Sequence, residues 1–183
     1  LCATPLEGAS AVCYEAIHTT VRRAIGNGKG TRLPKLRSAY AKLLDAASAR
    51  LEHFPAALAA DMSVWIAAAV AHQRLCKPER PLDPTLFSLA SGQLCDALRR
   101  LAEANVRSAA GSVGGTLHDW CIRALFESLE VVNGLVKQPW ARENVVEALS
   151  LAKELGSAVW SVKDRITIDR WLSTARARGM ATC

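Results

Sequence analysis

A short segment near the start of the chain gathers positive charge around a glycine-rich loop. Residues 22–37 contain no Asp or Glu, and the middle of the segment reads Gly26-Asn27-Gly28-Lys29-Gly30. Guanidinium and ammonium groups bind phosphates by displacing counterions, and a glycine-rich turn lets backbone N–H groups approach them closely. The candidate RNA- or polyanion-binding residues are therefore Arg22, Arg23, Lys29, Arg32, Lys35 and Arg37. A solvated loop without function fits the same pattern.

The same loop is not a nucleotide-binding P-loop. It follows a helical pattern, whereas a P-loop follows a strand, and it lacks the spacing and the Lys-Ser/Thr ending of that motif. We therefore expect no nucleotide and no small-molecule substrate at this position.

Two His and Cys pairs stand at helical spacing, His72 with Cys76 and His118 with Cys121. A structural zinc site needs four converging ligands, so Cys95 or Cys121 would have to join the first pair from neighbouring helices. A thiol beside an imidazole is the usual activated nucleophile, but core packing explains Cys121 equally simply. No Cys-x-x-Cys pair is present. We expect buried thiols and surface histidines, and neither a metal, a cofactor nor a catalytic residue.

Further basic residues follow in the second half of the chain: Arg99, Arg100, Arg107, Arg165, Arg170, Arg176 and Arg178. They would extend a basic surface if they shared one face. Because they alternate with Glu103, Asp164 and Asp169, solvated faces held by ordinary ion pairs are the favoured interpretation.

The composition predicts an all-α protein. Of the 183 residues 50% are hydrophobic and only 5% aromatic, with many Ala, Leu and Arg residues, a balance that favours helix over strand. The length suits one domain, residues 1–183. The net charge of +6 suits a polyanionic partner and is also common in organellar proteins.

Three features bear on where the protein resides. No window is long and apolar enough to span a bilayer, so we expect no membrane contact. The chain begins with Leu1, from which we expect a fragment or a processed form that has lost any targeting peptide. The six cysteines have no close pairs, and four lie in helical apolar patterns, which favours a reducing, intracellular compartment.

Apolar residues at spacings of three and four predict seven helices, separated by Gly and Pro signals. Asp83-Pro84 has the sequence of a helix cap and first turn, and the polar stretch 108–116 is the clearest loop. The expected helices span about 11–25, 36–54, 57–75, 84–106, 120–132, 145–159 and 166–177.

An internal repeat links these helices. An aromatic residue returns after 51, 55 and 51 residues, at Tyr14, Trp65, Trp120 and Trp171. A leucine follows the first three of them at 29 residues, at Leu43, Leu94 and Leu149. This period predicts helical hairpins 11–54, 57–106 and 117–163 and a final helix 166–177, each covering its neighbour's apolar face. An Ala- and Leu-rich irregular helical bundle is the alternative.

The stretch Met62-Ser63-Val64-Trp65-Ile66-Ala67-Ala68-Ala69-Val70-Ala71, followed by a Pro-rich turn and Asp83-Pro84-Thr85-Leu86-Phe87, resembles the octotricopeptide and heptatricopeptide repeats of organellar RNA-binding proteins. Residues 36–54 and 117–129 look like weaker members. The resemblance implies a Trp- and Ala-rich first helix, a short turn and a Leu-rich second helix in each repeat.

Together these features predict a helical-hairpin stack, similar to an α-solenoid, of about seven helices. We expect a non-enzymatic RNA-binding or structural component of a mitochondrial or other organellar ribonucleoprotein, such as a ribosome, with RNA and protein subunits as partners. The alternative is a protein-binding scaffold subunit of a large complex without RNA contact. In either case the tryptophans are expected mainly in the core.

Overall fold

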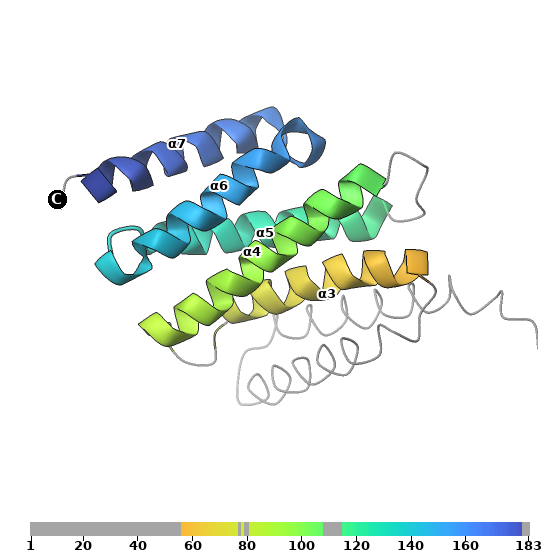
Figure 1. Ribbon diagram of the computed structural model, residues 1–183, viewed down its shortest axis with the longest axis horizontal. Coiled ribbons are helices and arrows are strands. Elements are labelled where there is room, and N and C mark those ends of the chain that lie inside the picture. Colours follow the sequence, from red (N-terminus) through yellow and green to blue (C-terminus); the bar gives the residue numbers. More distant parts are fainter. Residues whose placement is uncertain (1–55, 77, 79–80, 108–114, 181–183) are drawn as a thin grey trace, which may run out of the picture. The chain divides into compact units, whose positions relative to one another are not determined.

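The structure, a computed structural model, describes residues 56–76, 78, 81–107 and 115–180 (Figure 1). The expected helices 11–25 and 36–54 lie outside these residues, as does most of the expected loop 108–116. The described part is all-α, as predicted. It contains five α-helices and one 3-10 helix, and no strand occurs in it.

The first two described helices are α3 (Ala56–Cys76) and α4 (Pro84–Arg107). Both agree with the sequence-based bounds to within one residue. Asp83 caps α4, since its carboxylate Oδ1 accepts the backbone N–H of Leu86 at 2.8 Å and its carbonyl accepts that of Phe87 at 2.9 Å. Pro84 stands at the first helical position, where its missing N–H costs nothing. The predicted cap is confirmed.

Helix α5 (Gly115–Gly134) begins five residues before the expected 120 and ends two residues after the expected 132, and turns lead into the 3-10 helix η3 (Pro139–Ala141). Helix α6 (Arg142–Val159) follows directly, with a kink at Gly156. Helix α7 (Val162–Met180) begins four residues before the expected 166. The reason is a cap at Ser161, whose hydroxyl accepts the backbone N–H of Asp164 at 3.2 Å and donates to its carboxylate at 2.6 Å.

Contacts group the chain into two compact units, Leu1–Ile66 and Ala67–Cys183. The described part of the first unit is the N-terminal portion of α3, residues 56–66. The single domain 1–183 with its hairpin units therefore stays a prediction.

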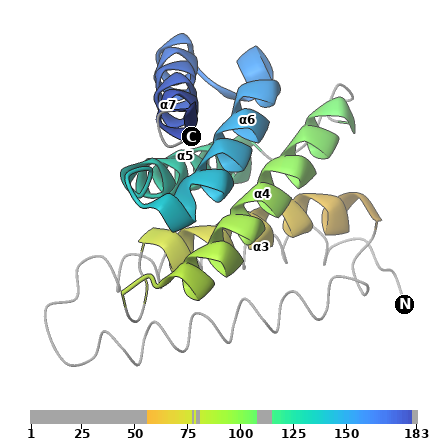
Figure 2. The ribbon, with the colours of Figure 1, turned by 60° about the vertical axis from the view of Figure 1, so that its left-hand side comes forward.

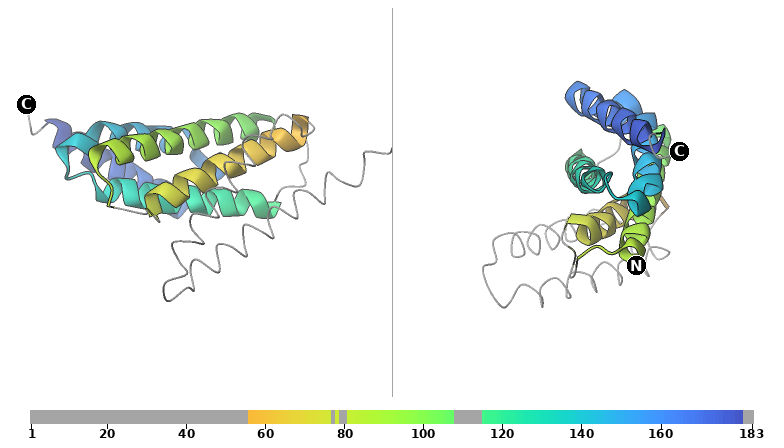
Figure 3. Two further views of the ribbon diagram at one scale, coloured as in Figure 1. Left: turned by 90° about the horizontal axis from the view of Figure 1, so that it is seen from below. Right: turned by 90° about the vertical axis from the view of Figure 1, so that its left-hand side faces the viewer.

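Within the second unit the helices lie in two layers. Helices α4 and α6 pack against each other in one layer, and α5, α7 and the part of α3 from Ala67 onward lie in the other (Figures 2 and 3). Helix α6 is central, because it contacts α4, α5 and α7. Helices that follow one another in sequence thus alternate between the layers.

The core of this unit consists of aliphatic residues at helical spacing. Leu94 of α4 and Leu149 of α6, two of the leucines that follow the repeated aromatics by 29 residues, are both fully buried. Burying a Leu side chain contributes about 1.5–3 kcal/mol. The other completely buried aliphatic side chains of α4, α5 and α6 include Ala97, Leu101, Leu125, Leu129, Val132, Val145, Ala148 and Ala152.

The face of α4 differs from the expectation at two positions. The leucine pattern of residues 84–106 predicts Leu89 among the apolar positions of this helix and leaves out Phe87, but Leu89 is exposed and Phe87 is completely buried. Phe87 shares the inner face with Leu94 and Leu98, whereas Leu89 points about 140° away from Leu94 at 100° per residue. Phe87 also contacts Trp140 of η3 edge to face, with ring centroids 5.5 Å apart.

The repeated aromatics, where described, serve packing. Trp65 is almost fully buried, and Trp171 lies with its ring centroid 5.6 Å from that of Phe126 on α5. Trp160 also contacts Phe126, at 6.0 Å. These rings join α5 to the end of α6 and to α7. Tyr14 lies outside the described residues, and the side chain of Trp120 is not among those described.

Candidate functional site

The predicted polyanion-binding residues are not among those that the structure describes. Arg22, Arg23, Lys29, Arg32, Lys35 and Arg37 all precede residue 56. The side chain of His118, a possible neighbour of Cys121, also falls outside the described set. Cys121 itself is buried, as core packing requires.

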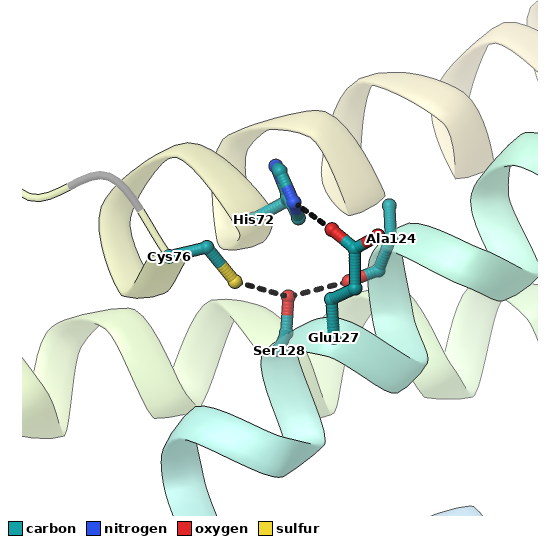
Figure 4. Close-up of polar contacts among 5 residues, drawn as sticks. All are labelled: His72, Cys76, Ala124, Glu127 and Ser128. Carbon is teal, nitrogen blue, oxygen red and sulfur yellow. Dashed lines mark hydrogen bonds and ion pairs between the residues drawn. The ribbon is translucent and has the colours of Figure 1, made fainter. Parts of the chain in front are cut away.

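The described residues that combine titratable and nucleophilic groups meet where α3 lies beside α5 (Figure 4). His72 and Cys76 stand one turn apart on α3, and Glu127 and Ser128 are consecutive on α5. His72 Nε2 lies 2.7 Å from Glu127 Oε2, and Cys76 Sγ lies 3.9 Å from Ser128 Oγ. We call these four residues the α3–α5 polar junction.

The protons in the junction can be assigned from donor chemistry. A carboxylate only accepts, so the Nε2–H of His72 donates to Glu127. The Ser128 hydroxyl donates to the carbonyl oxygen of Ala124 at 2.7 Å, one turn back on α5. A hydroxyl has one proton, so the Cys76 thiol is the donor toward Ser128 Oγ. Each polar side chain of the junction therefore has a partner on the neighbouring helix.

Burial explains why these partners matter. The His72 side chain is only 8% exposed and Ser128 is completely buried, whereas the Glu127 side chain is 46% exposed. A buried imidazole or hydroxyl without a hydrogen bond would cost about 1–3 kcal/mol. The junction satisfies both groups only when α3 and α5 have one particular register. The α3–α5 polar junction is therefore suited to holding these two helices in that register.

The sequence places His72 at the surface and offers other cysteines as the partners of Cys76. The structure corrects both points, because His72 is buried and the partners are Glu127 and Ser128. The i,i+4 spacing of His72 and Cys76 indicates a shared face. For the other side, the available signal is that Ser128 stands at helical spacing from the apolar residues Leu125 and Val132. No group of three or more His, Cys, Asp or Glu able to hold a metal occurs in the described part.

Several basic side chains of the described helices form ion pairs, as favoured from the sequence. Arg100 pairs with Asp96 at 2.8 Å within α4, and Lys153 pairs with Asp169 at 2.8 Å between α6 and α7. Arg176 instead donates to the hydroxyl of Ser150 at 3.3 Å. These exposed contacts contribute little to stability, roughly 0–1 kcal/mol for each pair.

One ion pair lies beside a buried thiol. Arg99 of α4 pairs with Glu147 of α6 at 2.7 Å, and Cys95 stands one turn before Arg99. The pKa of the Cys95 thiol is raised from 9.0 to about 11, chiefly by burial and also by Glu147, while Arg99 opposes the rise. At neutral pH Cys95 is therefore a protonated core residue, as the sequence predicts. Cys76, Cys95 and Cys121 are all free of disulfides.

Comparison with protein-family models, with curated proteins and with solved structures finds no match for this chain. Among the described residues, none of the helices is long and apolar enough to cross a membrane.

Proposed function

We propose that this chain is a non-enzymatic helical component of an organellar, for example mitochondrial, ribonucleoprotein such as a ribosome, and that it contacts RNA through residues 22–37. The observation that carries the proposal is the run of six cations without a carboxylate, from Arg22 to Arg37. Phosphates favour such a run because each neutralised charge releases counterions.

The distribution of charge supports this assignment. Residues 1–55 carry eight Lys and Arg against four Asp and Glu, whereas residues 56–183 carry 15 against 13. Within the described helices Arg99, Arg100 and Lys153 already pair with carboxylates of the same chain. The best candidate for polyanion contact is therefore the N-terminal basic segment.

The two-layer arrangement supports a hairpin stack as the underlying architecture. Consecutive helices alternate between layers, and Leu94 and Leu149 are buried at corresponding points of α4 and α6. In such a stack each unit covers its neighbour, and loops remain available for partners. The hydrogen-bonded His72 and the protonated Cys95 support a structural role for these residues. The cysteines with described side chains form no disulfide, which supports a reducing compartment.

Binding of the full-length chain to fluorescent single-stranded RNA over a series of salt concentrations tests the proposal. Replacing Arg22, Arg23, Lys29 and Arg32 by Ala is expected to weaken binding and to flatten the dependence of log K on log salt, by roughly 0.7 for each RNA phosphate that the variant no longer neutralises. A matched variant replaces four exposed cations elsewhere, Arg74, Arg123, Lys137 and Arg176, and should change the slope little.

The second candidate is a protein-binding scaffold without RNA contact. The near balance of charge in residues 56–183 favours it for the described helices. Absence of RNA binding by the intact chain at low salt would exclude the RNA proposal. Equal losses of affinity in the two four-residue variants would show that the basic segment has no special role.

A further inference from the structure

Helix α7 turns an apolar and basic face toward solvent. Ile168, Leu172 and Ala175 are buried on its inner side. On the opposite side Val162 and Ile166 are 64% and 65% exposed, although both are large apolar residues. At 100° per residue, Lys163 and Arg170 lie on the same outward side, and both are exposed. We call Val162, Lys163, Ile166 and Arg170 the outer face of α7.

Both acidic groups of α7 are engaged by other groups of the chain. Asp164 is half-buried and holds the Ser161 hydroxyl at the start of the helix. Asp169 lies about 20° from Val162 at 100° per residue and so borders the outer face, where its carboxylate pairs with Lys153 of α6 at 2.8 Å. Lys163 and Arg170 form no ion pair with any carboxylate of the described residues. With Asp169 neutralised by Lys153, the outer face therefore has a net positive charge from Lys163 and Arg170.

The neighbouring hydroxyls of α7 are also engaged within the helix. Thr167, Ser173 and Thr174 each donate to the backbone carbonyl four residues earlier, at 2.8–2.9 Å. Because these hydroxyl protons are used within the helix, a partner would be recognised on the outer face by apolar contact and by positive charge.

These two properties together identify the kind of partner. Covering Val162 and Ile166 favours apolar side chains, because about 25 cal/mol is gained for each Å² of apolar surface removed from water. Lys163 and Arg170 favour carboxylates at the edge of the contact. A phosphate backbone would use only the cations. A bilayer surface requires a broader apolar stripe than two residues.

A second copy of this chain fits poorly. In a two-fold contact the outer face would meet itself, which places Lys163 and Arg170 opposite the same cations. Like charges in direct opposition are destabilising, and the chain already carries a net charge of +6.

We propose that the outer face of α7 docks an acidic amphipathic helix of another protein. Val162 and Ile166 are one turn apart, about 5.4–6 Å along the axis, and Lys163 and Arg170 are two turns apart, about 10.5 Å. The partner helix accordingly carries apolar residues four positions apart, flanked by carboxylates about seven positions apart. This interface does not depend on RNA contact by residues 22–37.

The test uses the full-length chain and three designed, dye-labelled helical peptides, with binding followed by fluorescence anisotropy. The acidic peptide has leucines four apart flanked by glutamates. The basic peptide has lysines in place of the glutamates, and the scrambled peptide has the acidic composition with its leucines spread around the helix. The protein variants are Ile166→Ser and the double charge reversal Lys163→Glu with Arg170→Glu. The control is Leu89→Ser, at another exposed apolar site, on α4.

The wild-type chain is expected to bind the acidic peptide and to bind the scrambled one at least about tenfold more weakly, a difference of 1.4 kcal/mol. Ile166→Ser should weaken binding, Leu89→Ser should not, and the charge-reversed variant should prefer the basic peptide. Circular dichroism should show unchanged helix content, because every substituted side chain is exposed.

Several results would overturn the proposal. They are no binding of the acidic peptide up to millimolar concentration, equal binding of the scrambled peptide, or equal effects of Leu89→Ser and Ile166→Ser. Single-stranded RNA binding that depends on Lys163 and Arg170 but not on Ile166 would assign the face to a polyanion. Self-association of the wild-type chain that Ile166→Ser abolishes would assign it to a second copy.

Discussion

The indole Nε1–H of Trp160 donates to the backbone carbonyl of Ala152 at 2.6 Å, eight residues earlier. Ala152 lies four residues before Gly156, where the backbone leaves helical geometry. A regular α-helix would direct the N–H of residue 156 toward that carbonyl. The backbone N–H of Trp160 in turn donates to the carbonyl of Gly156 at 3.0 Å. Trp160 thus closes the kinked end of α6 with two hydrogen bonds.

Trp160→Phe is expected to lower the free energy of unfolding by about 1–3 kcal/mol, because the buried Ala152 carbonyl loses a donor while much of the ring packing remains. Chemical denaturation measures the change. The matched control is Trp140→Phe, which replaces a partly exposed indole that packs against Phe87. The interpretation fails if both substitutions cost the same.

Gly156 makes the kink, with φ 55° and ψ −142°. An added Cβ would meet nothing within 4 Å, so space is not the obstacle. L-residues nevertheless avoid this backbone region, and Gly156→Ala should destabilise the fold by about 1–3 kcal/mol. Gly92→Ala is the control, since Gly92 is helical and equally uncrowded. That change should stabilise the protein by about 0.4–1 kcal/mol. Opposite signs in thermal denaturation are the expected outcome, and equal signs would contradict the argument.

Much of the fold in the described part follows from local sequence signals. The bounds of α3 and α4 agree with the apolar periodicity, and the Asp83 cap is visible as Asp-Pro before an apolar run. The start of α7 differs from the prediction because the Ser161-x-x-Asp164 cap precedes the apolar pattern that predicts the helix. Leu89 is wrongly predicted in the core, because in a leucine-rich helix the residue type alone does not distinguish an exposed leucine from a buried one.

The partners across helices are not predictable in the same way. The spacing of His72 and Cys76 indicates a shared face, but Glu127 and Ser128 become their partners only through the register between α3 and α5. That register depends on the packing of side chains from several helices, which no local pattern encodes. The predicted basic site, residues 22–37, stays a prediction, because the described residues begin at 56.

The His72–Glu127 contact is expected to be energetically coupled. A double-mutant cycle with His72→Ala and Glu127→Ala should give a coupling energy of at least about 1 kcal/mol, because His72 is desolvated and its hydrogen bond replaces water. The comparison is the Arg99–Glu147 pair, which has the same 2.7 Å separation with both side chains 52% exposed. Its cycle should give less than about 1 kcal/mol. A weaker coupling for His72–Glu127 than for Arg99–Glu147 would show that burial is not decisive here.

The Cys95 thiol is expected to make stability depend on pH in the alkaline range. Its pKa is about 11 in the folded chain, raised chiefly by burial from 9.0, the value expected after unfolding. Between these values the unfolded chain has lost a proton that the folded chain retains. The free energy of unfolding therefore does not depend on this thiol's titration below about pH 9, and it falls as the pH rises toward 11. The unfolding free energies of the wild type and of Cys95→Ala should converge over this range. Only the wild type loses stability through the thiol, and the effects of the other titrating groups are common to both.

The same pKa predicts slow chemical modification of Cys95 in the folded chain. Iodoacetamide reacts with thiolates, and a rise of two pKa units lowers the thiolate fraction at neutral pH about a hundredfold, before burial limits access. Peptide mapping by mass spectrometry should therefore show Cys95 unmodified long after it reacts in denaturant. Glu147→Gln removes a charge that raises the pKa and should speed native modification, whereas Arg99→Gln should slow it. Equal rates in these two variants would show that access alone, and not the charge of the Arg99–Glu147 pair, controls the thiol.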